Sequence, residues 1–492
     1  MRRVCHSATP ARGPARRGRG KESLRPGTSH RQPSTPDSLT GDPRRGAVEF
    51  WSSSPHGTPA MNVIVFEDSA VRSLGVLTAA RPASDLLIGG TTLVESLAVF
   101  GDVHRSVRPL LARYLASLSA DRLPLWGGPG RRPLAAPASR HGGLVLVVNA
   151  RLVPSREAIA ALRGLIEAGH RGIVYRGGAV VAAILHRGGG PTTAADEAAV
   201  AAMLEPASKA SPFPAPAALE ALVVEAGLEP LASDEAAFRL VEQAHEVITA
   251  HEHAVEGVMA ARIDSGNYRQ LRPGLHVAAT AHIDDSVVVR GGPVLIEEAA
   301  EIGPFVCLDG PCWIGPRTRV NPHAWLRGFT AAGHDCRLGG EIEASVIEPW
   351  SNKAHEGYLG HSHLGSWVNI AAGTVSGNLK ASYGPVRQHS LLPDGGRTTI
   401  HTHRQFLGAM IGDLARTGIN ASLACGTRIG VAATVAGDVP EQVPAFANLL
   451  IGGDRSTPAQ AATVLERMMA RRGIRFEQAD RDLLAAIHES LV

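Results

Sequence analysis

The chain is poor in lysine and in aromatic residues. Its 492 residues include four lysines beside 45 arginines, and Phe, Trp and Tyr together make up 4%. A hydrophobic core must therefore be built mainly from Ile, Leu, Val and Ala. Glycine and proline are plentiful, with 54 and 33 residues, which suits a fold with many turns.

The cysteines form no recognisable pattern. Five are present, with no Cys-x-x-Cys pair and no regular spacing: Cys5, Cys307, Cys312, Cys336 and Cys425. A disulfide framework is excluded, and a reduced, cytoplasmic protein is predicted. No run of about 18 apolar residues occurs, and the N-terminus lacks the apolar stretch of a signal peptide. We therefore expect neither membrane insertion nor secretion.

Positive charge is confined to the start of the chain. The formal net charge is +3, but residues 1–60 carry +7 and the remainder −4. The body of the protein thus has no basic excess, so a nucleic-acid partner is not expected. Residues 1–60 also lack apolar periodicity, which predicts a disordered extension with Met61 as the working start. A basic tail that contacts phosphate or a membrane surface is the alternative.

The dominant pattern is an aliphatic or small residue at every sixth position between about Val277 and Val435. It runs through Ile296, Ile302, Leu308, Ile314, Val320, Leu326, Ala332 and Leu338, then breaks, and returns at Leu364, Ile370, Ile411, Thr417, Leu423, Ile429 and Val435. A period of six is neither helical nor alternating. It predicts a left-handed parallel β-helix of hexapeptide repeats, with three strands to a turn. Glycines that follow the aliphatic residues are expected to let the chain turn its corners.

The chain after residue 60 is predicted to divide into four segments. Residues 61–190 alternate strand and helix patterns, which predicts an α/β domain with a strand at 62–66, a largely helical 93–118, a helix capped by Ser155 and a hairpin around 173–185. Residues 191–270 are predicted to be a helical linker region, 271–450 the β-helix and 451–492 a helical cap on its end.

The start of the α/β domain carries a first resemblance. Phe66-Glu67-Asp68, followed by Leu77-Thr78-Ala79-Ala80-Arg81-Pro82, resembles the opening of sugar-1-phosphate nucleotidyltransferases. Their glycine-rich phosphate loop is absent, because Glu67-Asp68-Ser69-Ala70 stands in its place. The resemblance implies a sugar-1-phosphate, an NTP and Mg²⁺ if the domain is active, with Asp68 at the metal and Arg81 at a phosphate. A strand-end cap and a surface cation are the structural alternatives for these two residues.

The break in the repeat carries a second resemblance. Ser351 to Gly365, Trp367 to Thr374 and Asn378-Leu379-Lys380 resemble the acetyltransferase half of bifunctional glucosamine-1-phosphate acetyltransferase/N-acetylglucosamine-1-phosphate uridylyltransferases, and more closely a divergent bacterial branch of that family. The resemblance implies acetyl-CoA as acetyl donor, an amino-sugar-1-phosphate as acceptor and a homotrimer with its site between two chains. The acetyl transfer itself needs no metal.

Matched positions assign roles within this resemblance. His355 stands where the family keeps its catalytic base, a role that suits a histidine with a pKa near ambient pH. Tyr358 and Asn369 fall at amino-sugar positions, Arg327 near a phosphate position, and Ala372 and Asn378 where acetyl-CoA is held. Lys353 is a further candidate for the sugar phosphate, and Glu343 replaces a sugar-binding lysine. The structural alternatives are a solvated rim histidine and corner asparagines.

Two other functions remain open at this stage. One is a non-catalytic sugar-nucleotide sensor or scaffold, which the missing phosphate loop in the α/β domain favours. His361 and His363 are two residues apart, so they are predicted to point to one side of a strand and to offer zinc ligands between subunits, as in γ-type carbonic anhydrases.

Overall fold

The computed structural model describes residues 61–128, 143–187, 221, 223–224, 228–234, 236–391, 397–439 and 441–490. All of them belong to one compact unit, Pro43–Val492. The predicted disordered extension and most of the first half of the predicted linker region lie outside the described residues.

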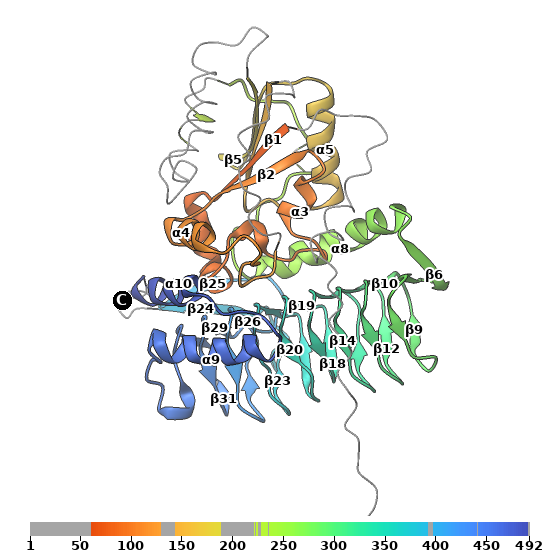
Figure 1. The fold of residues 1–492 in the computed structure, drawn as a ribbon, viewed down its shortest axis with the longest axis vertical. Coiled ribbons are helices and arrows are strands. Elements are labelled where there is room, and N and C mark those ends of the chain that lie inside the picture. The colour runs from red at the N-terminus through yellow and green to blue at the C-terminus, as the bar shows by residue number, and fades with distance from the viewer. Residues whose placement is uncertain are drawn as a thin grey trace, which may run out of the picture. The chain divides into compact units, whose positions relative to one another are not determined.

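The α/β domain is built on a mixed five-stranded sheet in the order β2-β1-β3-β5-β4 (Figure 1). β1 (Met61–Phe66) lies between two parallel neighbours, β2 (Gly101–Ser106) and β3 (Gly143–Asn149). β5 (Ala179–Arg187) pairs antiparallel with β3 and forms a hairpin with β4 (Gly172–Arg176). The first strand and the hairpin confirm the sequence predictions.

Short helices surround the sheet. They are η1 (Ser69–Leu74), α2 (Gly75–Thr78), η2 (Ala83–Asp85), α3 (Leu93–Leu97), α4 (Pro109–Ser117) and α5 (Arg156–Glu167). The Ser155 side chain accepts a hydrogen bond from the Ala158 amide and begins α5, as predicted. The prediction of a largely helical 93–118 is wrong in its middle, because β2 pairs along the whole of β1 there. Pairing with a distant strand overrode a weak local signal.

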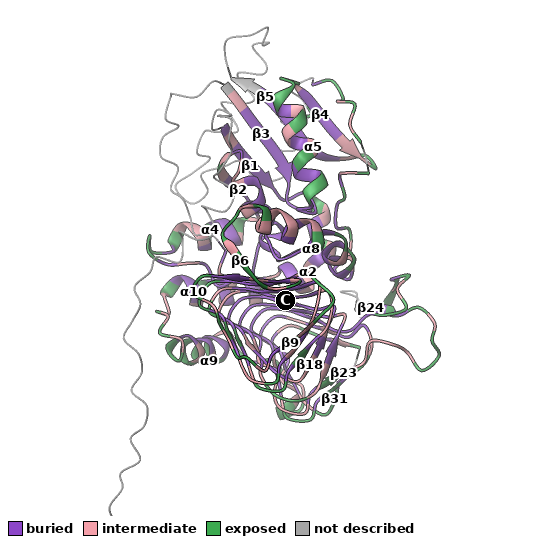
Figure 2. Cartoon of the chain, turned by 90° about the vertical axis from the view of Figure 1, so that its right-hand side faces the viewer, coloured by how far each residue is buried: buried purple, intermediate pink, exposed green. Residues whose placement is uncertain are grey.

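The coil is a parallel β-helix with three walls, and the region confirms the predicted repeat fold. Figure 2 shows the walls nearly end on, as nested triangles. Wall 1 consists of β6 (Tyr268–Arg272), β7 (Leu275–Ala278), β10 (Val294–Ile296), β13 (Cys312–Ile314), β16 (Thr330–Ala332), β19 (Val346–Ile347), β22 (His363–Leu364), β26 (Met410–Ile411), β29 (Arg428–Ile429) and β32 (Gln442–Val443).

The other two walls are made of equally short strands. Wall 2 holds β8 (His282–Ile283), β11 (Glu301–Ile302), β14 (Arg319–Val320), β17 (Arg337–Leu338), β20 (Asn352–Lys353), β27 (Arg416–Thr417) and β30 (Thr434–Val435). Wall 3 holds β9 (Val288–Arg290), β12 (Cys307–Asp309), β15 (Trp325–Leu326), β18 (Glu341–Glu343), β21 (Tyr358–Gly360), β23 (Val375–Ser376), β28 (Ser422–Leu423) and β31 (Asp438–Val439).

The six-residue period places aliphatic side chains inside the prism. Residues of the predicted series, from Ile296 to Val435, form one buried cluster. The glycines act differently from the prediction. Many corners are turned by residues with positive φ that are not glycine, such as Phe329 (59°) and His361 (48°), and others by glycines outside the predicted positions, such as Gly373 (73°). Gly315 is needed because a Cβ there would lie 2.7 Å from the Ala332 carbonyl oxygen of the next turn.

One long helix joins the α/β domain to the coil. α8 (Glu246–Asp264) packs Val255 and Met259 against outward side chains of wall 1, including Leu295 and Trp313. Figure 1 shows α8 running along this wall. Wall 1 is therefore apolar on both its faces, and the α/β region covers it.

Two helices follow the coil after η3 (Leu449–Ile451). α9 (Pro458–Ala470) and α10 (Gln478–Glu489) share a buried cluster with α4 and with Trp350, Trp367 and Phe446, which come from three corners between walls 1 and 2. The helices thus cover a side of the coil along several turns, which is more than the predicted end cap. A hairpin of β24 (Arg387–Leu391) and β25 (Arg397–His401) projects from the coil (Figure 2). Among the described residues, no helix has the length and apolarity to span a membrane.

Candidate functional site

Asp68, the predicted metal ligand, lies directly after β1 and is held by an arginine. Nε and Nη2 of Arg151 donate to its two carboxylate oxygens at 2.8 and 2.5 Å, and Nδ2 of Asn149 donates at 2.8 Å. Burial alone would raise the pKa of Asp68, but the bonds from Arg151 and Asn149 lower it. The carboxylate is therefore charged and already fully engaged by protein donors.

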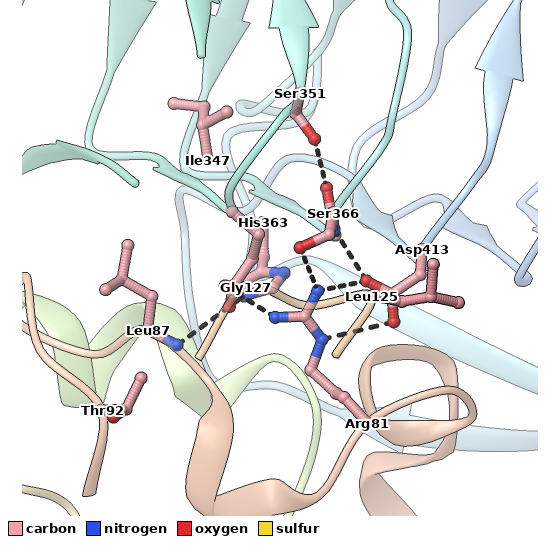
Figure 3. A network of polar contacts seen from close by, with 12 residues as sticks. Arg81, Leu87, Thr92, Leu125, Gly127, Ile347, Ser351, His363, Ser366 and Asp413 are labelled. Atoms are coloured by element: carbon pink, nitrogen blue, oxygen red, sulfur yellow. Dashed lines mark hydrogen bonds and ion pairs between the residues drawn. The ribbon is translucent and has the colours of Figure 1, made fainter. Parts of the chain in front are cut away.

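Arg81, the predicted phosphate ligand, is completely buried against the coil (Figure 3). Its Nη1 lies 2.6 Å from Oε2 of Glu348, Nη2 donates to the Ser366 hydroxyl at 2.8 Å, and Nη2 and Nε bind the Asp413 carboxylate. Burial would lower the pKa of Arg81, but the two carboxylates raise it. Against the expectation from the resemblance, Arg81 is not available to a phosphate in this structure. It connects the α/β domain to the coil.

Two more carboxylates near the ends of the strands are also paired with arginines of the protein. Nε of Arg108 donates to Oε2 of Glu67 at 2.9 Å, and Nη2 of Arg105 donates to Oδ1 of Asp85 at 2.7 Å. Both carboxylates are about 1% exposed. The edge of the sheet where a nucleotide would be expected to bind is thus occupied by ion pairs within the protein.

His355, the predicted base, lies in the loop between β20 and β21, at the corner of walls 2 and 3. Its side chain is exposed and makes no hydrogen bond or ion pair with any described residue. Ala372 lies at the same corner one turn further on, where the Gly373 amide donates to the Glu356 carbonyl at 3.2 Å. The structure therefore brings the predicted base and one predicted acetyl-CoA position to neighbouring turns.

Lys353 does not face a ligand, which corrects its predicted role. It pairs with the inward residue Leu338 and is 1% exposed. Its ammonium donates to the carbonyls of Gly339 and His355 at 2.9 and 2.6 Å. Burial lowers the pKa of Lys353 to about 8. From inside the coil, the Lys353 side chain thus stabilises the backbone of the corner at which His355 lies.

A chain of hydrogen bonds crosses the outer face of wall 3. The Tyr358 hydroxyl donates to Oε2 of Glu343 at 2.6 Å, and Nδ2 of Asn378 donates to the Tyr358 oxygen at 2.7 Å. Nδ2 of Asn378 also lies 3.0 Å from Nδ1 of His361, and Nη1 of Arg327 contacts Glu343 at 2.9 Å. Three predicted binding residues, Arg327, Tyr358 and Asn378, are thus brought together, and Glu343 and His361 join them.

Asn369 lies apart from this group. Its Oδ1 accepts a hydrogen bond from Nδ2 of Asn352 at 3.2 Å on wall 2, and Arg472 of the C-terminal region donates to Asn352 at 2.8 Å. Its predicted partnership with Tyr358 in one sugar site is not seen within the chain.

A pocket of about 700 Å³ opens beside the hydrogen-bonded chain, at the corner of walls 3 and 1. Arg327, Glu343 and His361 line it from the coil, and Glu252 and His253 of α8 line it from above. No sequence motif indicated the α8 residues, because their place is set by packing against wall 1. Asp309, which also lines the pocket, is an ordinary repeat position by sequence.

His361 and His363 have different surroundings. A corner at His361 separates them, so His361 faces the pocket while Nε2 of His363 lies 3.2 Å from Oε1 of Glu348 in the buried Arg81 network. The predicted orientation on one side of a strand is wrong for this reason. Within the described ranges, no three His, Cys, Asp or Glu side chains are grouped so as to hold a metal ion.

Comparisons with known proteins agree with this architecture. Residues 63–257 match the sugar nucleotidyl transferase family. A bifunctional sugar-1-phosphate nucleotidylyltransferase/acetyltransferase of Sulfurisphaera tokodaii is 35% identical over 156 residues, 31% of this chain and 37% of that protein. The bifunctional protein GlmU of Trichodesmium erythraeum is 31% identical over 170 residues, 34% of this chain and 29% of that protein. The chain is thus similar to sugar nucleotidyl transferases over residues 63–257 and to GlmU-like bifunctional proteins over about a third of its length. The matches span about a third of the length of these curated relatives.

The match with a solved UDP-N-acetylglucosamine acyltransferase covers 43% of this chain and 95% of that chain, with 14% identity and a TM-score of 0.18. The resemblance to sugar-1-phosphate nucleotidyltransferases also implies Mg²⁺ at the nucleotidyl site. The donor set does not fit that ion, because Asp68 is engaged by Arg151 and its neighbour Glu67 by Arg108. No metal-dependent step follows from these residues.

Proposed function

We propose that the β-helix transfers an acetyl group from acetyl-CoA to the amine of an amino-sugar-1-phosphate, in the biosynthesis of a nucleotide sugar. The observation that supports this most directly is the meeting of His355 and Ala372 on neighbouring turns at one exposed corner. These residues are 17 positions apart, and the family resemblance implies a different role for each, His355 as the base and Ala372 as a contact of acetyl-CoA. In a hexapeptide coil similar to that of GlmU-like proteins, a base and an acetyl-CoA contact on neighbouring turns can belong to one acetyltransferase site.

The transfer needs an uncharged amine as nucleophile. The amine nitrogen attacks the thioester carbon, a C–N bond forms, and the C–S bond breaks as the CoA thiolate leaves. His355 accepts the proton that the nitrogen loses and can return it to the thiolate. Backbone N–H groups at the coil corner are proposed to stabilise the oxyanion, a contribution commonly worth about 3 kcal/mol.

The proposed assembly is a homotrimer in the cytoplasm. Within its own chain, His355 has no contact among the described residues that would orient it. The exposed side chains of Phe305 and Ile419 lie at other turns of the same corner. A second copy packed along this edge would complete the site and cover these apolar groups.

The test is a coupled assay with acetyl-CoA and glucosamine 1-phosphate. Wild type should release CoA, and His355→Ala should lose at least a hundredfold in rate. His282→Ala, another exposed coil histidine, is the matched control and should retain full activity. Equal rates in His355→Ala and wild type would refute the assignment of the base. Turnover of no amino sugar by the wild type would refute the function.

For the α/β domain, a non-catalytic scaffold is the better supported of two functions. The ion pairs that close its strand ends favour this over formation of a UDP- or dTDP-sugar from a sugar-1-phosphate, an NTP and Mg²⁺. Release of pyrophosphate from a panel of sugar-1-phosphates and NTPs would reverse the preference. Zinc chemistry of the γ-carbonic-anhydrase kind has no matching donor group among the described residues.

A further inference from the structure

The outer face of wall 2 carries a row of polar side chains. Strand pairing places four of them at equivalent positions of successive turns: Arg319, Arg337, Asn352 and Asn369. Adjacent strands of a sheet lie about 4.8 Å apart, so each of these side chains can reach the next one. Two arginines therefore follow each other directly along this wall.

A third arginine reaches this row from the C-terminal helices. Arg472 lies in the turn after α9, and its Nη2 donates to Oδ1 of Asn352 in β20 at 2.8 Å (Figure 1). In this turn Gly473 has a φ of 67°, and the Ile474 amide donates to the Met469 carbonyl at 3.0 Å. Since a glycine in the left-handed region with this hydrogen bond defines the end of a helix, α9 sets the position of the Arg472 backbone.

Asn352 holds the Arg472 side chain in one orientation. A guanidinium can only donate, so the atom of Asn352 that it contacts is the side-chain oxygen. The NH₂ group of Asn352 then donates to Oδ1 of Asn369 at 3.2 Å. Both polar ends of Asn352 are thus engaged. Among the residues that the structure describes, none accepts from the remaining side-chain N–H groups of Arg472.

Arg337 has unused donors as well. Its Nη1 donates to the carbonyls of Cys336 and Arg317 at 2.9 and 3.3 Å, whereas its Nε and Nη2 have no acceptor in the described part of the chain. Arg337 and Arg472 are both half-buried, and neither forms an ion pair with a described carboxylate. A cation that is partly removed from water is normally paired, so an anion is the missing partner.

The two carboxylates beside these arginines are held by other cations. Glu301 lies one turn before Arg319, and its Oε2 is 2.8 Å from Nε of that arginine. Oδ2 of Asp335 lies 2.7 Å from Nη2 of Arg317 and 2.8 Å from Nδ1 of His334. Neither carboxylate is therefore available to balance a further positive charge.

Repulsion between the guanidinium groups adds to the effect of burial. Burial lowers the pKa of Arg337, and the neighbouring charges of Arg472 and Arg319 lower it further. The pKa of Arg472 is also lowered by burial, in spite of the nearby Asp335. Arg416, further along the wall, has its pKa lowered by burial alone. Arg337 and Arg472 thus differ from it in that two unpaired cations lie close together.

We propose that a phosphate group, as the free ion or in a monoester, binds between Arg337 and Arg472 and joins the C-terminal helices to wall 2. The free groups of both side chains are donors, which suits a ligand whose oxygens accept. A phosphate monoester carries a charge of about −1.5 to −2 at neutral pH and can balance both arginines, whereas one carboxylate would balance one. Guanidinium groups also match the geometry of phosphate oxygens. This site is separate from acetyl transfer and does not depend on it.

The test is thermal unfolding of the full-length protein in inorganic phosphate, with sodium chloride at equal ionic strength as the reference. Phosphate should raise the melting temperature of wild type above the reference, and the dependence on concentration gives the affinity. Arg337→Gln and Arg472→Gln should each weaken the affinity about tenfold or more. These residues lie on separate elements, so one variant decides the question if the other fails to fold.

The control for net charge is Arg290→Gln. It removes an exposed cation that is paired with Asp309 on wall 3 and should change the affinity by less than about twofold. Titrations with glucose 1-phosphate and with coenzyme A separate the sources of the phosphate. A tenfold loss in both site variants for one of these compounds identifies that source, and the same loss for inorganic phosphate alone identifies the free ion.

Three results would overturn the proposal. The first is a melting temperature of wild type that phosphate raises no more than chloride does. The second is an unchanged phosphate affinity in both Arg337→Gln and Arg472→Gln, which would assign Arg472 to the negative end of α9 alone. The third is a smaller assembly in Arg337→Gln without any phosphate effect in wild type, which would assign the arginines to a carboxylate of a second copy. No turnover is measured, so the outcome is independent of the His355 assay.

Discussion

The strand ends of the α/β domain and the corner beneath α8 use the same residue types in opposite ways. At the strand ends, the carboxylates of Asp68 and Glu67 and the guanidinium of Arg81 are buried and paired within the protein. Beneath α8, Glu343 keeps a free carboxylate oxygen toward an open pocket. The difference shows that the presence of matching residues does not locate a site. A site is located by the residues that stay accessible after packing, and by this criterion the coil is the better candidate for a functional site.

The largest expected effect comes from removing the buried cation of the α/β domain. Arg81→Met should lower the free energy of unfolding by about 3–5 kcal/mol, because it leaves Glu348 and Asp413 buried without a positive charge. Urea unfolding followed by circular dichroism measures the change. If Arg81 were instead a free ligand-binding residue, the variant would be as stable as wild type.

A rescue experiment sharpens this result. Changing Glu348 to Gln and Asp413 to Asn in the Arg81→Met background removes both uncompensated charges and should restore most of the lost stability. Failure to restore it would indicate that lost packing, and not charge, explains the first result.

The next effect concerns the one buried cation of the coil described above, Lys353, which has carbonyl partners but no contacting carboxylate. Burial lowers its pKa in the folded state to about 8 from an ordinary 10.5. Between these pH values the unfolded chain binds more protons, so stability should rise with pH, by roughly 1–3 kcal/mol. Lys353→Met should lack this rise in urea unfolding curves recorded from pH 7.5 to 10.5. Parallel curves for the two proteins would contradict the burial of the ammonium.

Much of the coil could be predicted because its signal is local. A core position every six residues needs only neighbouring sequence, and the predicted phase holds from Ile296 to Leu338. The inward place of Lys353 was missed because the turn is shortened there. Leu308 pairs with Leu326, 18 positions on, whereas Leu338 pairs with Lys353, only 15 positions on. A strict six-residue period applied across that turn therefore assigns the wrong residues to the core.

The partners of the charged residues could not be predicted in the same way. Arg81 and Asp413 are 332 positions apart, and Glu252 and Arg404 are 152 apart. Their pairing depends on how the α/β region lies on wall 1, for which no sequence period exists. The resemblance assigned Tyr358 to the amino sugar and Asn378 to acetyl-CoA, and it did not predict the hydrogen bond between them. It could not show that Asn369 faces another wall.

Acid should weaken the buried ion pairs of Asp68, which follows β1, and of Glu348, which lies in the coil. Their neighbouring cations hold the pKa values of Asp68 and Glu348 below the ordinary values of 3.8 and 4.5, in spite of burial. Such groups contribute stability above the pKa of the unfolded chain, and that stability is lost as pH falls through the folded-state pKa. We expect stability to fall below about pH 4, by roughly 1 kcal/mol per carboxyl. In Arg81→Met, the pKa of Glu348 should no longer be lowered by a neighbouring cation, so the free energy of unfolding should begin to fall at a higher pH.

The smallest expected change in stability concerns the first half of α8, which lines the pocket above the coil. Arg404→Ala removes a partly exposed ion pair with Glu252, so the free energy of unfolding should change by about 1 kcal/mol or less. Amide hydrogen exchange in the first half of α8 should nevertheless accelerate, because the clasp that holds this half over the coil is lost. Arg319→Ala removes the more exposed pair with Glu301 on wall 2 and should leave α8 exchange unchanged. If both variants changed α8 exchange equally, the Arg404 contact would not be what positions the first half of α8, and α8 would be held by its apolar packing on wall 1 alone.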